Sequence, residues 1–278
     1  GRIHEGQDPR RIVHRVPREA HLGVSAVNRG FWTLLRRETL RFVTLPNQTI
    51  LPPVVNASLY LLVFGILMGA RMHDVHGHAF IAFIFPGLIM MGSTVAAYQN
   101  SATSIFISRW EHFMEDLLVA PLSFVEMVSA FMLAAALRGL IVGLMNLGAG
   151  FFFLDVRIAH PGTFLAALSV TSLCFACVGI INGLLAKRWD HIAVLQNYIV
   201  TPLVFLGGVF YPSDALPERF AWINHANPLF YMVSALRYAY LGVADIAIER
   251  AFAVTTVLTL AFFWLSVDLF RRGHNLRT

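Results

Sequence analysis

The sequence predicts an all-α integral membrane protein with six transmembrane helices. Its 278 residues are 57% hydrophobic and only 13% charged, with a mean hydropathy of +0.64, which sets the chain apart from soluble domains. A helix needs about 20 largely apolar residues to cross a bilayer, whereas a membrane β-barrel shows short stretches of alternating polarity. Six continuous apolar stretches meet the helical requirement: Leu51–Ala70, Phe80–Tyr98, Met127–Leu154, Thr163–Ala186, Ile192–Phe210 and Ala251–Phe270.

The region before the first span divides into two parts. Residues 1–25 are polar and contain Pro9 and Pro17, so we expect a disordered basic tail there, with the transmembrane domain occupying residues 26–278. From about Ala26 to Val43, arginines gather on one side of a helical projection and apolar residues on the other. We expect this helix to lie on the inner leaflet among lipid head groups; a cytoplasmic extension of the first span is the alternative. Its characteristic residues are Arg29, Phe31, Arg36, Arg37 and Arg41.

Two residues of this helix do not fit the division into a basic and an apolar side. Glu38 and Leu40 both fall on the wrong side of the projection.

The connection between the second and third spans has a distinctive composition. Residues 108–122 read SRWEHFMEDLLVAPL, in which charged and apolar side chains alternate before Pro121. A helix with one charged and one apolar side suits docking into a groove on a partner protein, although an ordinary solvated connector is the alternative. The candidate docking residues are Arg109, Trp110, Glu111, His112, Phe113, Met114, Glu115, Asp116, Leu117 and Leu118.

The stretch after the fifth span, Leu203–Gly242, is too polar to cross the membrane and too aromatic for an exposed loop. Proline residues divide it into short pieces, and its aromatic residues favour the membrane–water boundary. We expect short helices that dip back into the outer leaflet, acting either as a gate or as a structural cap. The candidate residues are Gly207, Gly208, Phe210, Tyr211, Pro212, Asn227, Pro228, Tyr231 and Arg237.

The distribution of basic residues predicts the topology. Fifteen basic residues precede the first span, follow the last or occupy the connections near Arg109 and Lys187, against five on the opposite side. Basic residues favour the cytoplasmic side, so both termini are expected in the cytoplasm of a bacterial inner membrane. The net charge of +5 therefore reflects topology, and we expect no nucleic-acid partner.

One basic residue, Arg138, lies within a predicted span. A charge at mid-span costs at least about 2.5 kcal/mol on insertion scales, so its side chain should face a partner or water. Asn146 and Asn182 are the candidate partners. A structural hydrogen-bond network and contact with the anionic head group of a bound molecule are the two alternatives for this side chain.

The sequence contains few candidates for a nucleotide-binding, metal or catalytic site. Its single lysine, Lys187, follows Ala186, so the Gly-Lys-Ser/Thr of a phosphate-binding loop is absent. If ATP powers the protein, another polypeptide hydrolyses it. The cluster HDVHGH (residues 73–78) reads as a polar turn more readily than as a metal site. We expect no catalytic, cofactor or metal residues here.

Five motifs carry a resemblance to a known family. They are FPGLIMMG (Phe85–Gly92), EDLLVAPLS (Glu115–Ser123), ALRGL in the third span, LGGVFYP (Leu206–Pro212) and NPLFYMVSALRYAYLG (Asn227–Gly242). From about Phe31 onwards the chain resembles the permease subunits of type-2 ATP-binding-cassette exporters, which include drug, lipid, polysaccharide and nodulation-factor exporters.

The resemblance implies an exporter permease for a drug or an amphiphilic, lipid-linked or glycan-like cargo, and leaves that cargo undefined. It implies that Ser108–Leu118 is a coupling helix inserted into a separate ATP-binding subunit, and that the segment after span five forms external re-entrant helices. Two permeases would form a homodimer in membrane lipid, with two ATP-binding subunits that hold ATP and Mg.

Two other classes of protein are the alternatives. An integral-membrane enzyme acting on lipid-linked substrates would use groups near His73–His78 or His225. An ion-coupled carrier would need carboxylates within the spans, but Asp268 and Glu126 lie at the ends of spans.

Overall fold

The computed structural model describes residues 23–68, 75, 77–212, 217, 219 and 221–273. Within these residues the regular structure is helical, apart from one isolated bridge between Val75 and His78. The predicted tail is outside the described residues up to position 22, as are His73, Asp74 and His76 of the histidine cluster.

Five segments are long and apolar enough to cross a membrane. They are α4 (Phe80–Trp110), α6 (Phe124–Gly150), α7 (Pro161–Leu185), the run Asp190–Val209 and α12 (Ile248–Arg271). The run Asp190–Val209 consists of α8 (Asp190–Leu195), η4 (Gln196–Val200), α9 (Thr201–Val204) and η5 (Phe205–Val209), where η marks a π-helical turn. The all-helical class is thus confirmed.

The predicted first span differs from the other five. It follows α2 (Pro46–Thr49) and is helical as α3 (Leu51–Tyr60) and η2 (Leu61–Met68), but it is not among the five candidate spans. The count of six spans therefore stays a prediction.

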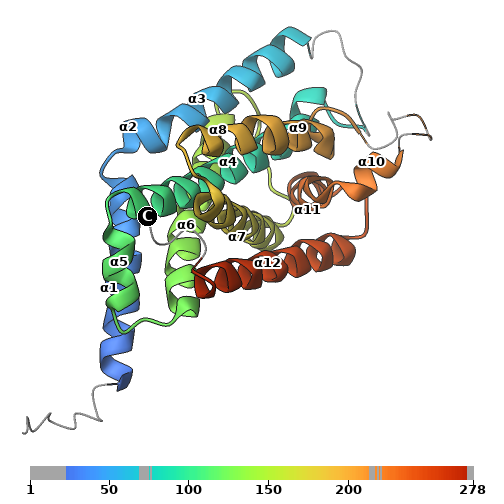
Figure 1. The fold of residues 1–278 in the computed structure, drawn as a ribbon. Helices are drawn as coiled ribbons and strands as arrows, with labels where there is room; N and C mark the ends of the chain where they lie inside the picture. Colours follow the sequence, from blue (N-terminus) through green and yellow to red (C-terminus); the bar gives the residue numbers. More distant parts are fainter. Residues whose placement is uncertain are drawn as a thin grey trace, which may run out of the picture.

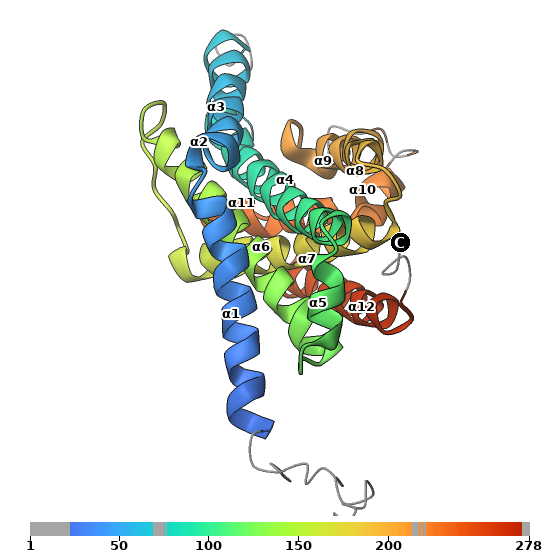
Figure 2. The same ribbon diagram turned by 60° about the vertical axis from the view of Figure 1, so that its left-hand side comes forward.

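The helices α4 and α7 pack closely because small residues line their contact. A Cβ atom added to Gly183 would lie 2.8 Å from the carbonyl oxygen of Ala102, and one added to Gly179 would overlap the backbone of Tyr98. Small residues four apart let helix backbones approach in a membrane. In Figure 2, α4 runs between α3 on one side and α8 and α9 on the other.

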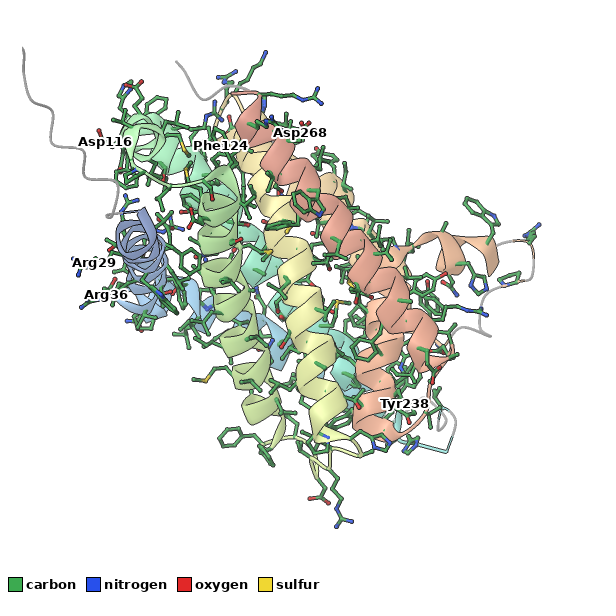
Figure 3. All side chains as sticks on the ribbon, turned by 90° about the horizontal axis from the view of Figure 1, so that it is seen from below. Arg29, Arg36, Asp116, Phe124, Tyr238 and Asp268 are labelled. Atoms are coloured by element: carbon green, nitrogen blue, oxygen red, sulfur yellow. The ribbon has the colours of Figure 1, made fainter. Side chains whose placement is uncertain are left out.

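The bundle has two distinct ends. Figure 3 places Asp116, Phe124 and Asp268 at one end and Tyr238 at the other. We call the first the α5 end, after the short helix α5 (Phe113–Val119), and the second the α11 end, after α11 (Pro228–Leu241). The helix α10 (Ala221–Ala226) precedes α11.

The first helix, α1 (Gly23–Val43), lies across the bundle. In Figure 1 it runs nearly at right angles to α7 and α12, and in Figure 3 it is seen end-on while α6, α7 and α12 run lengthwise. It crosses α6 and packs against it at the α5 end. Its buried residue Leu34 belongs to a hydrophobic group, here called the junction core, that includes Met114, Leu117, Met127, Phe131, Ile180 and Phe270.

Candidate functional site

The four described arginines of α1 do not share one side. Arg29 and Arg36 are exposed, and they point away from the bundle in Figure 3. Arg37 and Arg41 turn toward it, with the Arg37 guanidinium 3.5 Å from the centre of the Phe113 ring. Phe31 is half-buried beside the junction core. The helix thus has a free basic face and a second basic face that contacts its neighbours.

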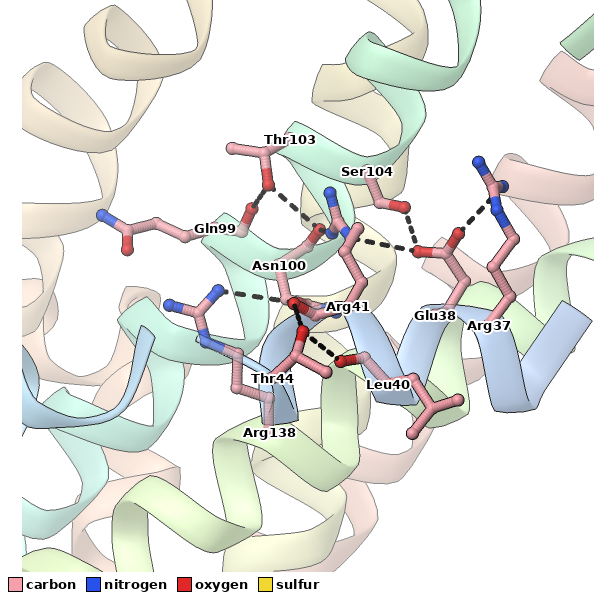
Figure 4. Close-up of polar contacts among 10 residues, drawn as sticks. All are labelled: Arg37, Glu38, Leu40, Arg41, Thr44, Gln99, Asn100, Thr103, Ser104 and Arg138. Carbon is pink, nitrogen blue, oxygen red and sulfur yellow. Dashed lines mark hydrogen bonds and ion pairs between the residues drawn. The ribbon is translucent and has the colours of Figure 1, made fainter. Parts of the chain in front are cut away.

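Glu38 explains this arrangement. Its side chain is buried and accepts a hydrogen bond from Ser104 of α4, while Arg37 Nη1 lies 3.4 Å and Arg41 Nε 3.5 Å from its carboxylate oxygens (Figure 4). A buried carboxylate is costly unless it is paired and hydrogen-bonded. Burial lowers the pKa of Arg41, and Glu38 opposes that shift. Sequence reasoning missed this role, although the misfit of Glu38 on the basic side was its signal.

The predicted docking stretch is divided by a sharp turn. Ser108 to Trp110 complete α4, after which His112 adopts a left-handed conformation with φ 58° and α5 begins at Phe113. A left-handed residue cannot continue a right-handed helix, so α5 leaves α4 in a new direction.

The two sides of α5 have different environments. Met114 and Leu117 are buried in the junction core, and Phe113 and Leu118 pack at its edge. Glu111, Glu115 and Asp116 are exposed, as are Trp110 and His112, whose Nδ1 lies 3.5 Å from Glu115 Oε1. The described residues therefore present an acidic outer surface on an apolar base.

Arg109 points away from this outer surface. Its Nη1 donates to the carbonyl oxygens of Gly183 at 2.9 Å, Leu184 at 3.1 Å and Ala186 at 2.9 Å. The last carbonyls of a helix lack partners within the helix, and a cation there also complements the helix dipole. Arg109 thus holds the end of α7 to the end of α4, a function that its position in the sequence did not indicate.

The segment after span five is held together by polar contacts at the α11 end. Gly208 has φ 76° and interrupts the helix before Phe210. Asn227 caps α11 by accepting from Leu229 N at 3.0 Å, and its Nδ2 donates to Leu203 O at 2.7 Å. Tyr211 donates to Leu206 O at 2.7 Å.

The remaining predicted residues complete this region. Gly207 lies against α11, where an added Cβ would come 3.0 Å from that of Leu229. Phe210 stacks on Phe205 with their ring centres 5.2 Å apart. Tyr231 donates to His225 O at 3.0 Å. Pro228 opens α11, and Pro212 is half-buried at the end of the preceding described stretch.

Arg237 is the buried charge of this region. It donates to Gly208 O at 2.6 Å, forms an ion pair with Asp245 and places its guanidinium 3.9 Å from the ring centre of Phe83. The sequence predicted Arg237 as a site residue but not Asp245, whose pairing becomes apparent only in three dimensions.

Arg138 is buried, but it does not form the predicted hydrogen bonds with Asn146 and Asn182. Its Nη2 donates to Thr49 O at 2.9 Å, and its Nη1 lies 3.5 Å from Asn100 Oδ1 (Figure 4). Asn182 instead donates to the Tyr98 hydroxyl at 2.5 Å. The side-chain amide of Asn146 makes no hydrogen bond within the described part of the chain. The α1–α3 segment, which sequence reasoning did not place beside Arg138, supplies the carbonyl.

Among the described residues, no three side chains of His, Cys, Asp or Glu gather where they could hold one metal ion. Cys174 and Cys177 are buried free thiols within α7.

Comparison with known sequences identifies the family to which the chain belongs. The profile of the ABC-2 type transporter family matches residues 29–241. The chain belongs to this family. The ABC-2 match includes most of α1 and all of α5 and α11, whereas Asp245 and α12 follow it in the chain.

Individual members of the ABC-2 family align over nearly their whole length. The inner membrane transport permease YadH of Escherichia coli strain K12 is 36% identical over 253 residues, covering 89% of this chain and 98% of YadH. Nodulation protein J of Rhizobium leguminosarum bv. viciae is 25% identical over 260 residues, covering 90% and 98%. With its several apolar helices, the chain is a multi-pass ABC-2 membrane permease.

Proposed function

We propose that this chain is the membrane subunit of an ATP-driven exporter. Two copies form a path for a drug or an amphiphilic, lipid-linked or glycan-like cargo, and two separate ABC ATP-binding subunits supply the energy. The chain crosses the bacterial inner membrane six times, with both termini in the cytoplasm, and the ATP-binding subunits bind at α5.

The structure of α5 carries this proposal. Its acidic outer surface, with Glu115 and Asp116 exposed, is free for a partner, while Met114 and Leu117 fix it in the junction core. A helix that is exposed on one side and packed on the other can transmit the movement of a bound partner to the rest of the bundle. The Arg37–Phe113 contact would pass it to α1.

Charge supports the orientation. Arg29, Arg36, Lys187, Arg188, Arg271 and Arg272 are described basic residues near or at the α5 end, outside the apolar cores of the spans. An excess of such residues marks the cytoplasmic side.

The unevenly buried spans support a homodimer. Within the chain, 33% of the apolar window of Asp190–Val209 and 17% of that of α12 are buried, against 72% for α4. Exposed apolar residues continue along both segments that flank α4, for example Leu59 on α3 and Tyr198 on η4. A second copy would cover these surfaces and close a path over α4.

The test is co-purification and ATP turnover with the cognate ATP-binding subunit, isolated from native membranes. Changing Glu115→Arg with Asp116→Arg should reduce association by about tenfold or more, because two acids at the contact become bases. The matched control, Asp155→Arg with Glu249→Arg, changes two exposed acids outside α5 and should leave association intact. Unchanged association and turnover in a folded α5 variant would remove α5 from the contact. A permease that recruits no ATP-binding subunit would favour an ion-coupled carrier.

A further inference from the structure

A polar cleft lies beside α4 in the half of the bundle toward the α5 end. It has a volume of about 540 Å³ and is bounded by α1, α2, α4, α6 and α8. Its lining includes Arg41 and Arg138 and the amides of Gln48, Gln99, Asn100 and Gln196. No aspartate or glutamate is among the residues that line it.

The positive charge of the cleft is only partly neutralised. Arg138 is 7% exposed and donates to two neutral oxygens, those of Thr49 and Asn100, with no ion pair to a described carboxylate. Arg41 donates to Asn100 O at 3.0 Å and shares the single carboxylate of Glu38 with Arg37. A buried charge without a counter-charge is strongly unfavourable, so the cleft is suited to an anion.

The geometry of the donors suits a phosphate or carboxylate group. Guanidinium groups present several N–H donors in a plane and recognise such oxyanions through paired hydrogen bonds. The side-chain amides beside them add neutral donors, and Gln99 Nε2 is already directed by a 3.0 Å hydrogen bond to Gln196 Oε1.

The other walls of the cleft are apolar. Phe42, Leu45 and Ile192 line it, with Ile107 and the half-exposed Trp189 at its edge. Ile107 and Trp189 also line an adjoining hollow of about 410 Å³ that holds Lys187, Arg188 and Asp190. A molecule with an anionic head and an apolar chain could therefore place its head at the arginines and its chain along this wall.

We propose that this cleft binds the phosphate head group of an amphiphile drawn from the cytoplasmic leaflet, and that this amphiphile is the cargo. The binding stands on the cleft itself, whereas the role as cargo rests on the proposed function. The chemistry is shared by a resident membrane lipid and by free phosphate, and the test separates these sources.

The first arm measures binding to the full-length permease in neutral detergent. The probes are dioctanoyl phosphatidic acid, dioctanoyl phosphatidylcholine and inorganic phosphate. Phosphatidic acid should bind about tenfold or more tightly than phosphatidylcholine, because only its exposed phosphomonoester can accept paired hydrogen bonds from both arginines. Equal affinity for the two lipids, or binding of inorganic phosphate as tight as that of phosphatidic acid, would overturn the proposal.

The second arm uses charge-neutral variants. Arg138→Gln and Arg41→Gln should each weaken phosphatidic acid binding by about tenfold, a typical loss for one charge-assisted hydrogen bond. The matched control is Arg271→Gln, an exposed residue at the end of α12 outside the cleft. If Arg138→Gln does not fold, Arg41→Gln decides alone. Equal affinity in Arg41→Gln and the control would contradict the assignment.

The third arm asks whether the bound amphiphile is cargo. With the ATP-binding subunit present, phosphatidic acid should stimulate ATP turnover in the wild-type chain but not in Arg41→Gln. Binding without stimulation in an assembled complex would identify a resident lipid and overturn the cargo role. A permease that binds phosphatidic acid but recruits no ATP-binding subunit would leave the cleft as an anion site and reject the exporter function.

Discussion

The Arg37 guanidinium of α1 lies over the ring of Phe113 at the start of α5, with its central carbon 3.5 Å from the ring centre. This contact joins the helix that crosses the bundle to the helix proposed to meet the ATP-binding subunit. Nearby, a Cβ added to Gly30 would come within 2.9 Å of Leu122, so α1 also touches the connection that follows α5. Movement of α5 would therefore displace α1 as well.

The first prediction concerns this contact. Phe113→Leu keeps an apolar side chain but removes the ring, and should cost about 0.5–1 kcal/mol, the value of a partly exposed cation–π contact. A double-mutant cycle with Arg37→Gln isolates the pair, because Arg37 also contacts Glu38. The free energy of unfolding in mixed detergent is the measurement. A coupling energy near zero would mean that the two residues are merely adjacent.

The second prediction concerns the clamp between α4 and α7. Arg109→Ala should lower the unfolding free energy by about 1.5–3 kcal/mol, because three carbonyls at the end of α7 lose a charged donor. Arg109→Lys should recover part of the loss. Arg272→Ala, which removes an exposed ion pair with Asp268, should cost under about 1 kcal/mol. Equal losses for Arg109→Ala and Arg272→Ala would argue against the clamp.

The third prediction concerns the buried carboxylate of α1. Glu38→Ala should destabilise the chain by about 1–3 kcal/mol, because Ser104 and Arg41 lose a buried charged partner while Arg37, whose side chain is 40% exposed, keeps its hydration. The exposed Glu249 provides the control, and Glu249→Ala should have little effect. Thermal unfolding in detergent compares the two. A mild effect of Glu38→Ala would show that water replaces the carboxylate.

The fourth prediction concerns the interruption at Gly208, where φ is 76°. Gly208→Ala should cost about 1–2 kcal/mol because a Cβ is disfavoured in the left-handed region, whereas Gly208→Asn should cost less. Gly162 in α7 has open space around it, so Gly162→Ala is the control and should be neutral or slightly stabilising. If all three variants unfold at one temperature, the conformation at Gly208 carries no strain.

The fifth prediction tests the homodimer. Single cysteines in place of Leu59 or Tyr198, on the two segments that flank α4, should cross-link two chains through a bismaleimide in native membranes. Trp264 of α12 is comparably exposed, at 60% against 55% for Leu59, so Trp264→Cys is the control and should stay monomeric. Dimers through Trp264→Cys alone would place the interface on α12.

The hydrophobic pattern was sufficient to predict the helical class, because a continuous apolar run and a helix satisfy the same requirement in lipid. It could not predict the boundary inside residues 108–118. That boundary depends on the left-handed His112, and histidine, although enriched at positive φ among residues other than glycine, adopts it in only a small fraction of cases.

The partners of the buried charges were equally hidden from the sequence. Arg138 bonds to the backbone carbonyl of Thr49, and a carbonyl leaves no mark in residue types. Glu38 was visible only as an exception to the pattern of α1. Thr49 is far from Arg138 along the chain and Ser104 is far from Glu38, so spacing within one helix could not reveal these two contacts; the ion pairs of Glu38 with Arg37 and Arg41 lie within α1.

The close packing of α4 on α7, together with the Arg109 clamp, has a mechanical consequence. These two helices form a close-packed frame within the chain, since Cβ atoms added at Gly179 and Gly183 would meet the backbone of α4. The flanking segments are built differently, with π-helical turns at Leu61–Met68, Gln196–Val200 and Phe205–Val209, which often mark places where a helix can rearrange. Under the proposed function, these flanking segments would move relative to α4 and α7 during transport. Substitutions that make the flanking segments more rigid should then slow ATP-driven transport without lowering the stability of the fold.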